Sequence, residues 1–275
     1  GTTLLVDGGA TFHHTILAPQ PTPGVSLSLL WTLALVGIFV GVIPIALGML
    51  WFPAMQGLSD RLLHAILAFS AGILAFLAFD AGFEAFEIAE AVPGAYAGSL
   101  VLVMGALGTL LVIQAVGSYW SDGGDVSPLG LAYLIALGIG LHNLAEGLAI
   151  GSSFALGRVS LGAFLIIGFM IHNVTEGPAI VAPVADGGRP SLGHFVAIGA
   201  IAGVPVVFGG WLGSLAYSPL LGTFFLAVGV GAILQVDWDI ARMIRRERRL
   251  GTALNAVGFL VGLVVMYATD LLVAL

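Results

Sequence analysis

The sequence predicts an all-α protein, a polytopic membrane helix bundle of eight transmembrane helices. Composition is the first reason, because 59% of the residues are hydrophobic and only 8% are charged, whereas a soluble domain carries about 25% charged residues. The second reason is that the chain contains eight apolar runs of about 20 residues, the length that crosses the hydrocarbon core of a bilayer. The third is that the basic residues gather between these runs on one side.

The N-terminal stretch differs from the rest of the chain. Residues 1–24 are polar and contain glycine and proline, and they lack the basic and apolar regions of a signal peptide. We predict an extracytoplasmic tail here, in which the pair His13-His14 either captures metal or is simply solvated. Residues 25–275 are predicted to form a single eight-helix transmembrane domain.

Turn residues divide this domain into its helices. The predicted spans are 27–52, 59–91, 97–118, 128–156, 160–185, 192–216, 219–243 and 251–274. Pro44, Pro178 and Pro205 fall inside spans. A proline cannot bond to the carbonyl four residues back, so Pro178 is expected to free the carbonyl of Val174, which either bends the fifth helix or offers an extra oxygen at the site.

The basic residues predict the orientation of the bundle. All eight are arginines; Arg61, Arg189 and the run between 242 and 249 belong to odd-numbered loops, and only Arg158 belongs to an even-numbered one. The positive-inside rule then places the odd loops in the cytoplasm and both termini outside. The absence of lysine and cysteine fits a prokaryotic inner membrane. We expect no nucleic-acid partner, although the net charge of −7 says little about this by itself.

The motif H-N-x-x-E-G occurs twice, at 142–147 and at 172–177, each time within a long apolar run. On a helix its histidine and glutamate, four residues apart, lie on one face. The turn at Gly157 is fifteen residues from each histidine, or about 22 Å along a helix, which is close to the bilayer centre. An antiparallel hairpin therefore brings His142, Glu146, His172 and Glu176 to matching depth. These donors suit a borderline divalent transition metal, although a single histidine on an apolar helix is more often packed or hydrogen-bonded.

Further acids lie inside the spans without basic side chains at comparable depth. Asp80 and Glu84 share one stripe of the second span. A charge at the bilayer centre costs roughly a few kcal/mol, so these carboxylates are either protonated or neutralised by a cation. Together with Glu87 and Asp270 they are predicted to form an acidic mouth that concentrates cations, unless Glu87 and Asp270 are ordinary interfacial carboxylates.

Three other polar residues have two interpretations each. Asp239 forms an ion pair with Arg242 three residues later or belongs to a metal site on the release side. Asn143 and Asn173 follow the two histidines and point about 100° away from them. Each asparagine is a weak metal ligand or a hydrogen-bonding partner across helices.

The doubled motif resembles that of the ZIP (Zrt/Irt-like) family of divalent metal transporters. In that family, H-N-x-x-E-G in the fourth of eight helices and Q/H-x-x-x-E-G in the fifth form a metal site, and both termini lie outside. The match falls in the fourth and fifth predicted helices here, on His142, Asn143, Glu146, His172, Asn173 and Glu176.

Several positions depart from the family pattern. Val204, before Pro205, stands where related members carry a glutamate. Leu74 lies near the position of a second-helix ligand, for which Asp80 or Glu84 would substitute. In the family the loop after the third helix is often long and rich in histidine, whereas the loop at 118–127 is short and has no histidine. The acid that the family carries in the seventh helix, by contrast, has a match near Asp239.

The resemblance implies transport into the cytoplasm by alternating access. The substrate would be Zn²⁺ first, with Fe²⁺, Mn²⁺, Co²⁺ or Cd²⁺ as further candidates. The metal would be the substrate and not a cofactor, and the protein a transporter of the cell (inner) membrane and not an enzyme. The resemblance leaves homodimerisation open.

Two other function classes remain open on the residues alone. An intramembrane metalloenzyme would use the same donors, although neither the H-E-x-x-H motif of zinc proteases nor the E-x-x-H pairs of di-iron bundles occur in the sequence. A proton-coupled carrier of a small organic cation would use the carboxylates as proton relays. Sensitivity of transport to the identity of the metal separates these alternatives from the first.

Overall fold

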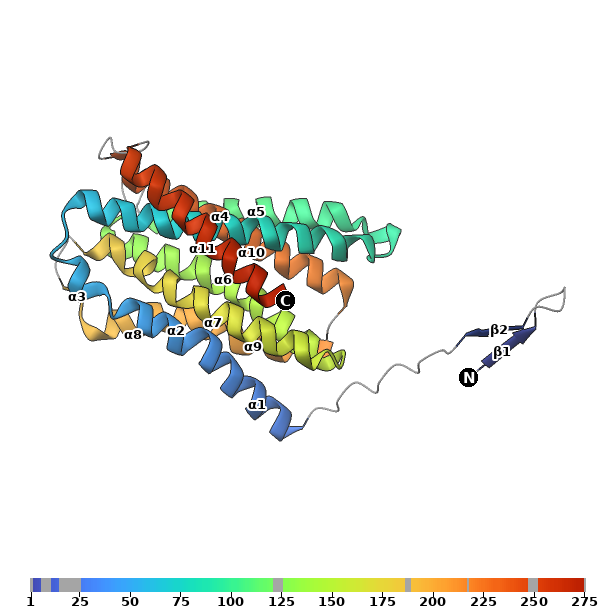
Figure 1. Cartoon of the computed structure of the whole chain (residues 1–275). Coiled ribbons are helices and arrows are strands. Elements are labelled where there is room, and N and C mark those ends of the chain that lie inside the picture. Colours follow the sequence, from blue (N-terminus) through green and yellow to red (C-terminus); the bar gives the residue numbers. More distant parts are fainter. Residues whose placement is uncertain are drawn as a thin grey trace.

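A computed structural model describes residues 2–5, 11–14, 26–120, 126–185, 189–216, 218–246 and 252–274. Within these ranges, eight helices are long and apolar enough to cross a membrane (Figure 1). The predicted fold class, an all-α polytopic bundle, is thereby confirmed, and the chain is a multi-pass membrane protein. The side of the membrane on which each terminus lies stays a prediction.

The helices match the predicted apolar runs closely. The first span is interrupted, with a π-helix in its middle and a short helix at its end, and the sixth span consists of two helices. The elements are α1 (Leu27–Gly37), η1 (Ile38–Val42), α2 (Ile43–Met49) and α3 (Phe52–Met55) in the first span, then α4 (Asp60–Glu90), η2 (Gly94–Tyr96), α5 (Gly98–Trp120), α6 (Pro128–Ala155), α7 (Val159–Val181), η3 (Ala182–Val184), α8 (Leu192–Gly203), α9 (Pro205–Ala216), α10 (Pro219–Arg246) and α11 (Ala253–Ala274).

The N-terminal tail contains two short strands, β1 (Thr2–Leu5) and β2 (Thr11–His14). They pair antiparallel, with Thr3 opposite His13. The predicted histidine pair thus lies on β2, and its side chains lie outside the described part of the structure. Metal capture by this pair stays a prediction.

Local sequence signals set the ends of several helices. Ser26 Oγ accepts a hydrogen bond of 3.1 Å from the backbone N–H of Leu29 at the start of α1, and Ser127 caps α6 in the same way. Such caps satisfy N–H groups that have no partner within the helix. The turn between α6 and α7 contains Gly157 with φ +72°, a left-handed conformation that glycine adopts without strain. The hairpin predicted from the motif spacing therefore turns at the expected residue.

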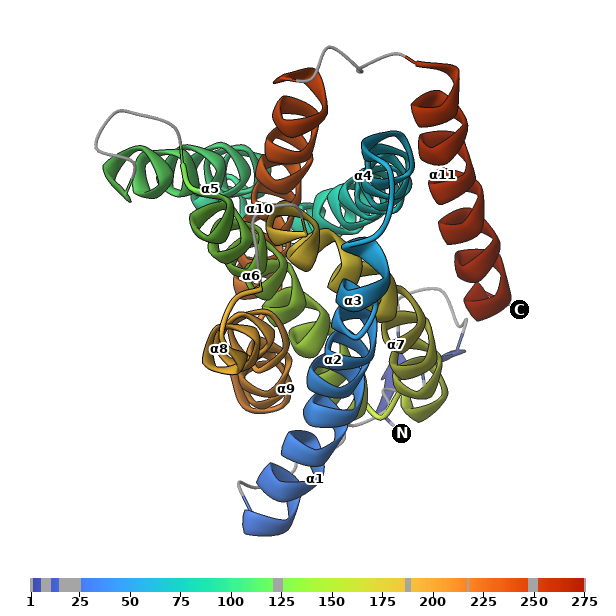
Figure 2. The ribbon, with the colours of Figure 1, turned by 90° about the vertical axis from the view of Figure 1, so that its left-hand side faces the viewer.

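Helix α6 lies inside the bundle, whereas α5 and α11 lie at its edge, as the end-on view in Figure 2 shows. Helix α6 packs most extensively against α9 and also contacts α10, α7 and α8. More than half of the residues in the apolar stretches of α4, α6 and α10 are buried, compared with 17% and 22% in those of α5 and α11. The first copy of the motif is thus carried by an internal helix.

Two spans are broken at proline. In the first, the N–H of Ile43 bonds to the carbonyl of Ile38 in the π-helical pattern, and Pro44 has no N–H to offer to Val40. In the sixth, α8 ends before Pro205, the first residue of α9. The two spans meet at their breaks, since a Cβ on Gly203 would lie 2.8 Å from the Cα of Val42.

The motif helices pack closely against these broken spans. A Cβ on Gly147 of α6 would lie 2.8 Å from the carbonyl carbon of Val206 in α9, and one on Gly177 of α7 would lie 2.5 Å from the Cα of Gly48 in α2. Small residues permit such approach in membrane bundles. Helix α7 continues through Pro178, and the backbone carbonyl of Val174, which Pro178 was expected to free, faces Gly48.

Candidate metal centre

The first copy of the motif places a histidine and a glutamate in direct contact. His142 Nε2 lies 3.0 Å from Glu146 Oε1, one helical turn along α6. Both side chains are buried, with only 4% and 3% of their residue surfaces exposed. The sequence produces this contact locally, because residues four apart share a helix face.

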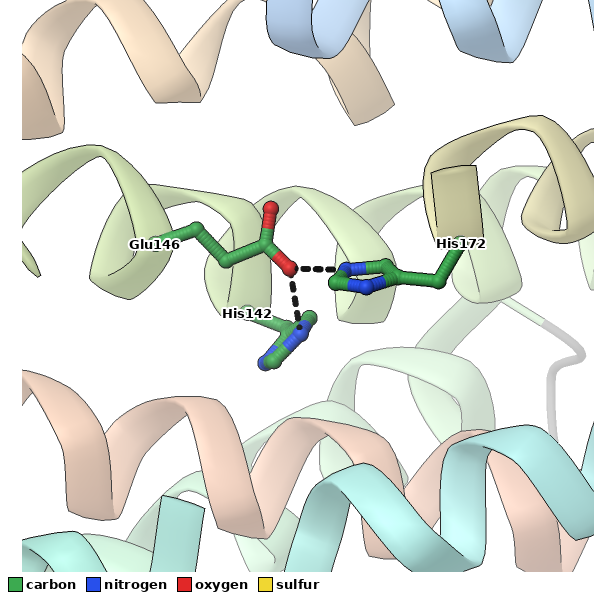
Figure 3. A group of neighbouring side chains, drawn as sticks. All are labelled: His142, Glu146 and His172. Atoms are coloured by element: carbon green, nitrogen blue, oxygen red, sulfur yellow. Dashed lines mark hydrogen bonds and ion pairs between the residues drawn. The ribbon is translucent and has the colours of Figure 1, made fainter. Parts of the chain in front are cut away.

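The second copy contributes its histidine to the same oxygen. His172 Nε2, on α7, also contacts Glu146 Oε1, as the two dashed lines in Figure 3 show. The ring of Phe169 packs edge-on against His172 at 5.5 Å between centroids and so limits rotation of the imidazole. Side chains of two helices thus converge on one carboxylate oxygen, in a buried site that is shielded from water.

The geometry of this cluster suits a divalent cation. One donor atom from each of His142, Glu146 and His172 lies within 4.8 Å of the others. A tetrahedral Zn²⁺ with bonds of about 2.0–2.1 Å separates neighbouring ligand atoms by about 3.3 Å. The His142–Glu146 separation of 3.0 Å is only a few tenths of an ångström shorter, whereas His172 and Glu146 lie closer together and would have to move apart to admit an ion.

Glu176 lies close to the cluster but makes no hydrogen bond. Only 1% of its surface is exposed, and neither carboxylate oxygen has a hydrogen-bond partner. It interacts electrostatically with Glu146 and His142, and the side chain of Asn143 also acts on its carboxylate. A buried carboxylate without a partner is costly. Glu176 is therefore available as a fourth ligand, and that role stays a prediction.

The two asparagines of the motifs donate hydrogen bonds to the broken spans. Asn143 Nδ2 donates to the carbonyl of Ala202 at 3.0 Å, and Asn173 Nδ2 donates to the carbonyl of Val40 at 3.0 Å. Asn173 Nδ2 also lies 3.2 Å from Glu146 Oε2. Hydrogen bonding across helices is thus observed for both amides, while metal ligation by their Oδ1 atoms stays a prediction.

The acids predicted in the second span lie outside the three-residue cluster. Asp80 and Glu84 are exposed on the surface of α4. Asp80 interacts electrostatically with Asp270, His142 and His172, so its charge acts on the cluster from a distance. Metal binding by Asp80 and Glu84 stays a prediction.

Asp239 has local partners instead. Its Oδ2 accepts a hydrogen bond of 3.1 Å from Gln235 Nε2, and its Oδ1 lies 3.9 Å from Arg242 Nη1. The ion pair with Arg242, one of the two interpretations, is thus observed, and a release-side metal site stays a prediction. Arg248 and Arg249 of the predicted arginine run lie outside the described residues.

Sequence reasoning missed the backbone acceptors of the asparagines, the carbonyls of Val40 and Ala202. The available signal was proline: Pro44 leaves Val40 without its helical partner, and Pro205 follows the last turn of α8. The two positions that depart from the family pattern offer no ligand atoms. Leu74 belongs to the apolar core, and Val204 lies at the junction of α8 and α9.

Fold and site together define a multi-pass membrane protein with a buried His/Glu cluster that could bind a metal ion. No protein-family model matches the chain, and no curated protein matches it by sequence. The functional conclusion therefore depends on the residues of the cluster and on their chemistry.

Proposed function

We propose that this protein transports divalent transition metal ions, Zn²⁺ first, into the cytoplasm through the site of His142, Glu146, His172 and Glu176. One observation carries the proposal: two imidazoles and a carboxylate from two apolar helices converge in a buried cluster. Buried polar groups inside membrane spans are costly and mark ion pathways by default. The protein would belong to the ZIP family, which its doubled motif resembles.

The donor set favours transition metals over Mg²⁺ and Ca²⁺. These two ions prefer oxygen ligands, whereas imidazole suits zinc and other first-row metals. The chain has no cysteine, so no thiolate contributes to binding. A site of imidazoles and carboxylates would release its metal more readily than a thiolate site.

The position of the cluster favours transport over catalysis. Each histidine lies fifteen residues from Gly157, near the middle of its span, so that a bound ion is far from both membrane surfaces. Transporter sites lie at this depth and open to one side at a time. The inward direction of transport is inferred from the distribution of the arginines. The metal would be the substrate of the protein and not its cofactor.

The test is metal uptake by the full chain reconstituted in liposomes. We expect saturable uptake of Zn²⁺ and Cd²⁺, little uptake of Mg²⁺, and loss of uptake in His172→Ala. His194→Ala is the matched control, because His194 bonds to the hydroxyl of Tyr133 at 2.9 Å outside the cluster. This variant should retain uptake.

Two outcomes would overturn the proposal. Tight metal binding without uptake would favour an intramembrane metalloenzyme. Uptake of an organic cation that does not depend on metal would favour a proton-coupled carrier.

A further inference from the structure

A chain of contacts runs from a proline in the first span to the metal cluster. Pro44 cannot donate to the carbonyl of Val40, four residues earlier. Asn173 of α7 donates to this carbonyl at 3.0 Å. The same amide nitrogen lies 3.2 Å from Glu146 Oε2, the carboxylate oxygen that does not contact the histidines.

The orientation of this amide follows from its acceptors. The Val40 carbonyl and the Glu146 carboxylate are oxygens that only accept hydrogen bonds when the carboxylate is ionised. The NH₂ end of the Asn173 side chain must therefore face both of them. Asn173 is fully buried, so water cannot replace either acceptor, and each NH₂ proton has a separate use.

The consequence for Glu146 is a fixed carboxylate. Its Oε2 accepts from Asn173, and its Oε1 faces His142 and His172. If residue 44 carried an N–H, the helix would offer the Val40 carbonyl a backbone partner, which would compete with Asn173 for this oxygen and weaken its hydrogen bond. Partners of this kind orient metal ligands and strengthen binding.

We propose that Pro44 is a positioning residue for the metal cluster: it reserves the Val40 carbonyl for Asn173, which in turn holds Glu146 in the orientation that receives the metal. This inference rests on the proposed metal-binding function and adds the first span to the site. Pro44 does not touch the cluster itself and acts through Asn173.

The other asparagine provides an internal comparison. Asn143 donates to Ala202 in the last turn of α8, where helix carbonyls lack N–H partners from their own helix. Its amide nitrogen has no hydrogen bond to Glu146 among those of the described residues. The effect of Pro44 on metal binding should therefore depend on Asn173 and not on Asn143.

The test is a double-mutant cycle read out by Zn²⁺ titration of the purified full chain in detergent. We expect Asn173→Ala to weaken Zn²⁺ binding roughly tenfold to a hundredfold, as loss of a partner of a metal ligand does. Pro44→Ala should weaken it about tenfold, at the lower end of that range. In the Asn173→Ala background, Pro44→Ala should have no further effect, because the residue through which it acts is gone.

The control cycle pairs Asn173→Ala with Pro205→Ala, whose effects should add because Pro205 borders the helix that Asn143 contacts. Additive effects of Pro44→Ala and Asn173→Ala would overturn the proposal, and so would unchanged affinity in Pro44→Ala. A purely structural role would lower the unfolding temperature without coupling in Zn²⁺ affinity.

A second comparison does not depend on the folding of the Pro44 variant. Asn173→Leu should weaken Zn²⁺ binding more than Asn143→Leu, since Asn173 reaches Glu146, which contacts both histidines, whereas Asn143 acts only on Glu176. Equal losses would overturn the proposal. If the unaltered protein failed to bind Zn²⁺, the proposed function itself would fail, which is a distinct result.

Discussion

The two copies of the H-N-x-x-E-G motif have the same spacing but opposite surroundings at their glutamates. Glu146 contacts His142, His172 and Asn173, whereas both oxygens of Glu176 lack hydrogen-bond partners. Spacing places a histidine and a glutamate on one helix face, but neighbouring helices decide which partner each one finds. One carboxylate is already held, and the other is left uncommitted.

The difference arises from the second copy. His172 turns across the helix pair to Glu146 instead of along its own helix to Glu176. Asn173 also serves the first copy's glutamate. Both polar groups of the second copy that could approach Glu176 are thus engaged elsewhere.

The docking of the two copies is similar by contrast. The asparagine of each donates to a carbonyl of a broken span, and the glycine of each packs against the backbone of the same span. The asymmetry is therefore confined to the carboxylates. Glu146, whose carboxylate already has partners, and Glu176, whose oxygens lack hydrogen-bond partners, form part of a site that a cation would complete.

The largest effect is expected for Glu146→Ala, which removes the shared partner of both histidines. Zn²⁺ affinity should fall by more than about a hundredfold, beyond the range for loss of a partner of a ligand. Calorimetric titration of the purified protein measures this, with Glu90→Ala at the exposed end of α4 as the control. An affinity close to that of the unaltered protein would contradict the central place of Glu146.

The variants Gly177→Ala and Gly147→Ala test whether the two motif copies pack in the same way against the broken spans. Each new Cβ would collide with backbone atoms of a broken span, and such overpacking lowers the free energy of unfolding by about 1–3 kcal/mol. Thermal unfolding in detergent measures the loss. Gly82→Ala on α4 is the control, because a Cβ there meets nothing within 4 Å. A loss in only one motif variant would show that the two copies dock differently.

The sequence was sufficient for features that depend on local pattern. Apolar runs gave all eight spans, and the i,i+4 spacing gave the contact between His142 and Glu146. The same rule suggested a shared face for His172 and Glu176, and there the outcome depended on a residue 26 positions away in sequence, Glu146.

Backbone acceptors could not be predicted in the same way. Pro44 indicated that the carbonyl of Val40 would lack a helical partner, but not that it would meet Asn173, 133 residues later. Such pairings depend on how helices pack, which the spacing within one helix does not determine. Proline positions in apolar spans nevertheless mark the carbonyls that need a partner.

Glu176→Gln sharpens the contrast between the two glutamates. The substitution keeps the size of the side chain and removes its charge, so Zn²⁺ affinity should fall about tenfold, equivalent to about 1.4 kcal/mol. Because the Glu176 carboxylate is buried beside Glu146 and neither of its oxygens accepts a hydrogen bond of good geometry, removing its charge should leave the metal-free protein no less stable than before. Titration and thermal unfolding without metal measure the two effects. A clear loss of stability in the metal-free protein would show that Glu176 has a structural partner after all.

The smallest effect is expected for Asp80→Asn, since Asp80 lies outside the cluster yet interacts with one histidine from each motif copy. Its charge would attract cations toward both copies alike, so the initial rate of Zn²⁺ uptake should fall about twofold at low ionic strength. In 1 M salt, where the screening length is about 3 Å, the difference should disappear. Uptake by liposomes at the two ionic strengths measures this. A loss that persists in high salt would mean that Asp80 binds the metal directly, and the site would then include a ligand from α4 as well as from the two motif helices.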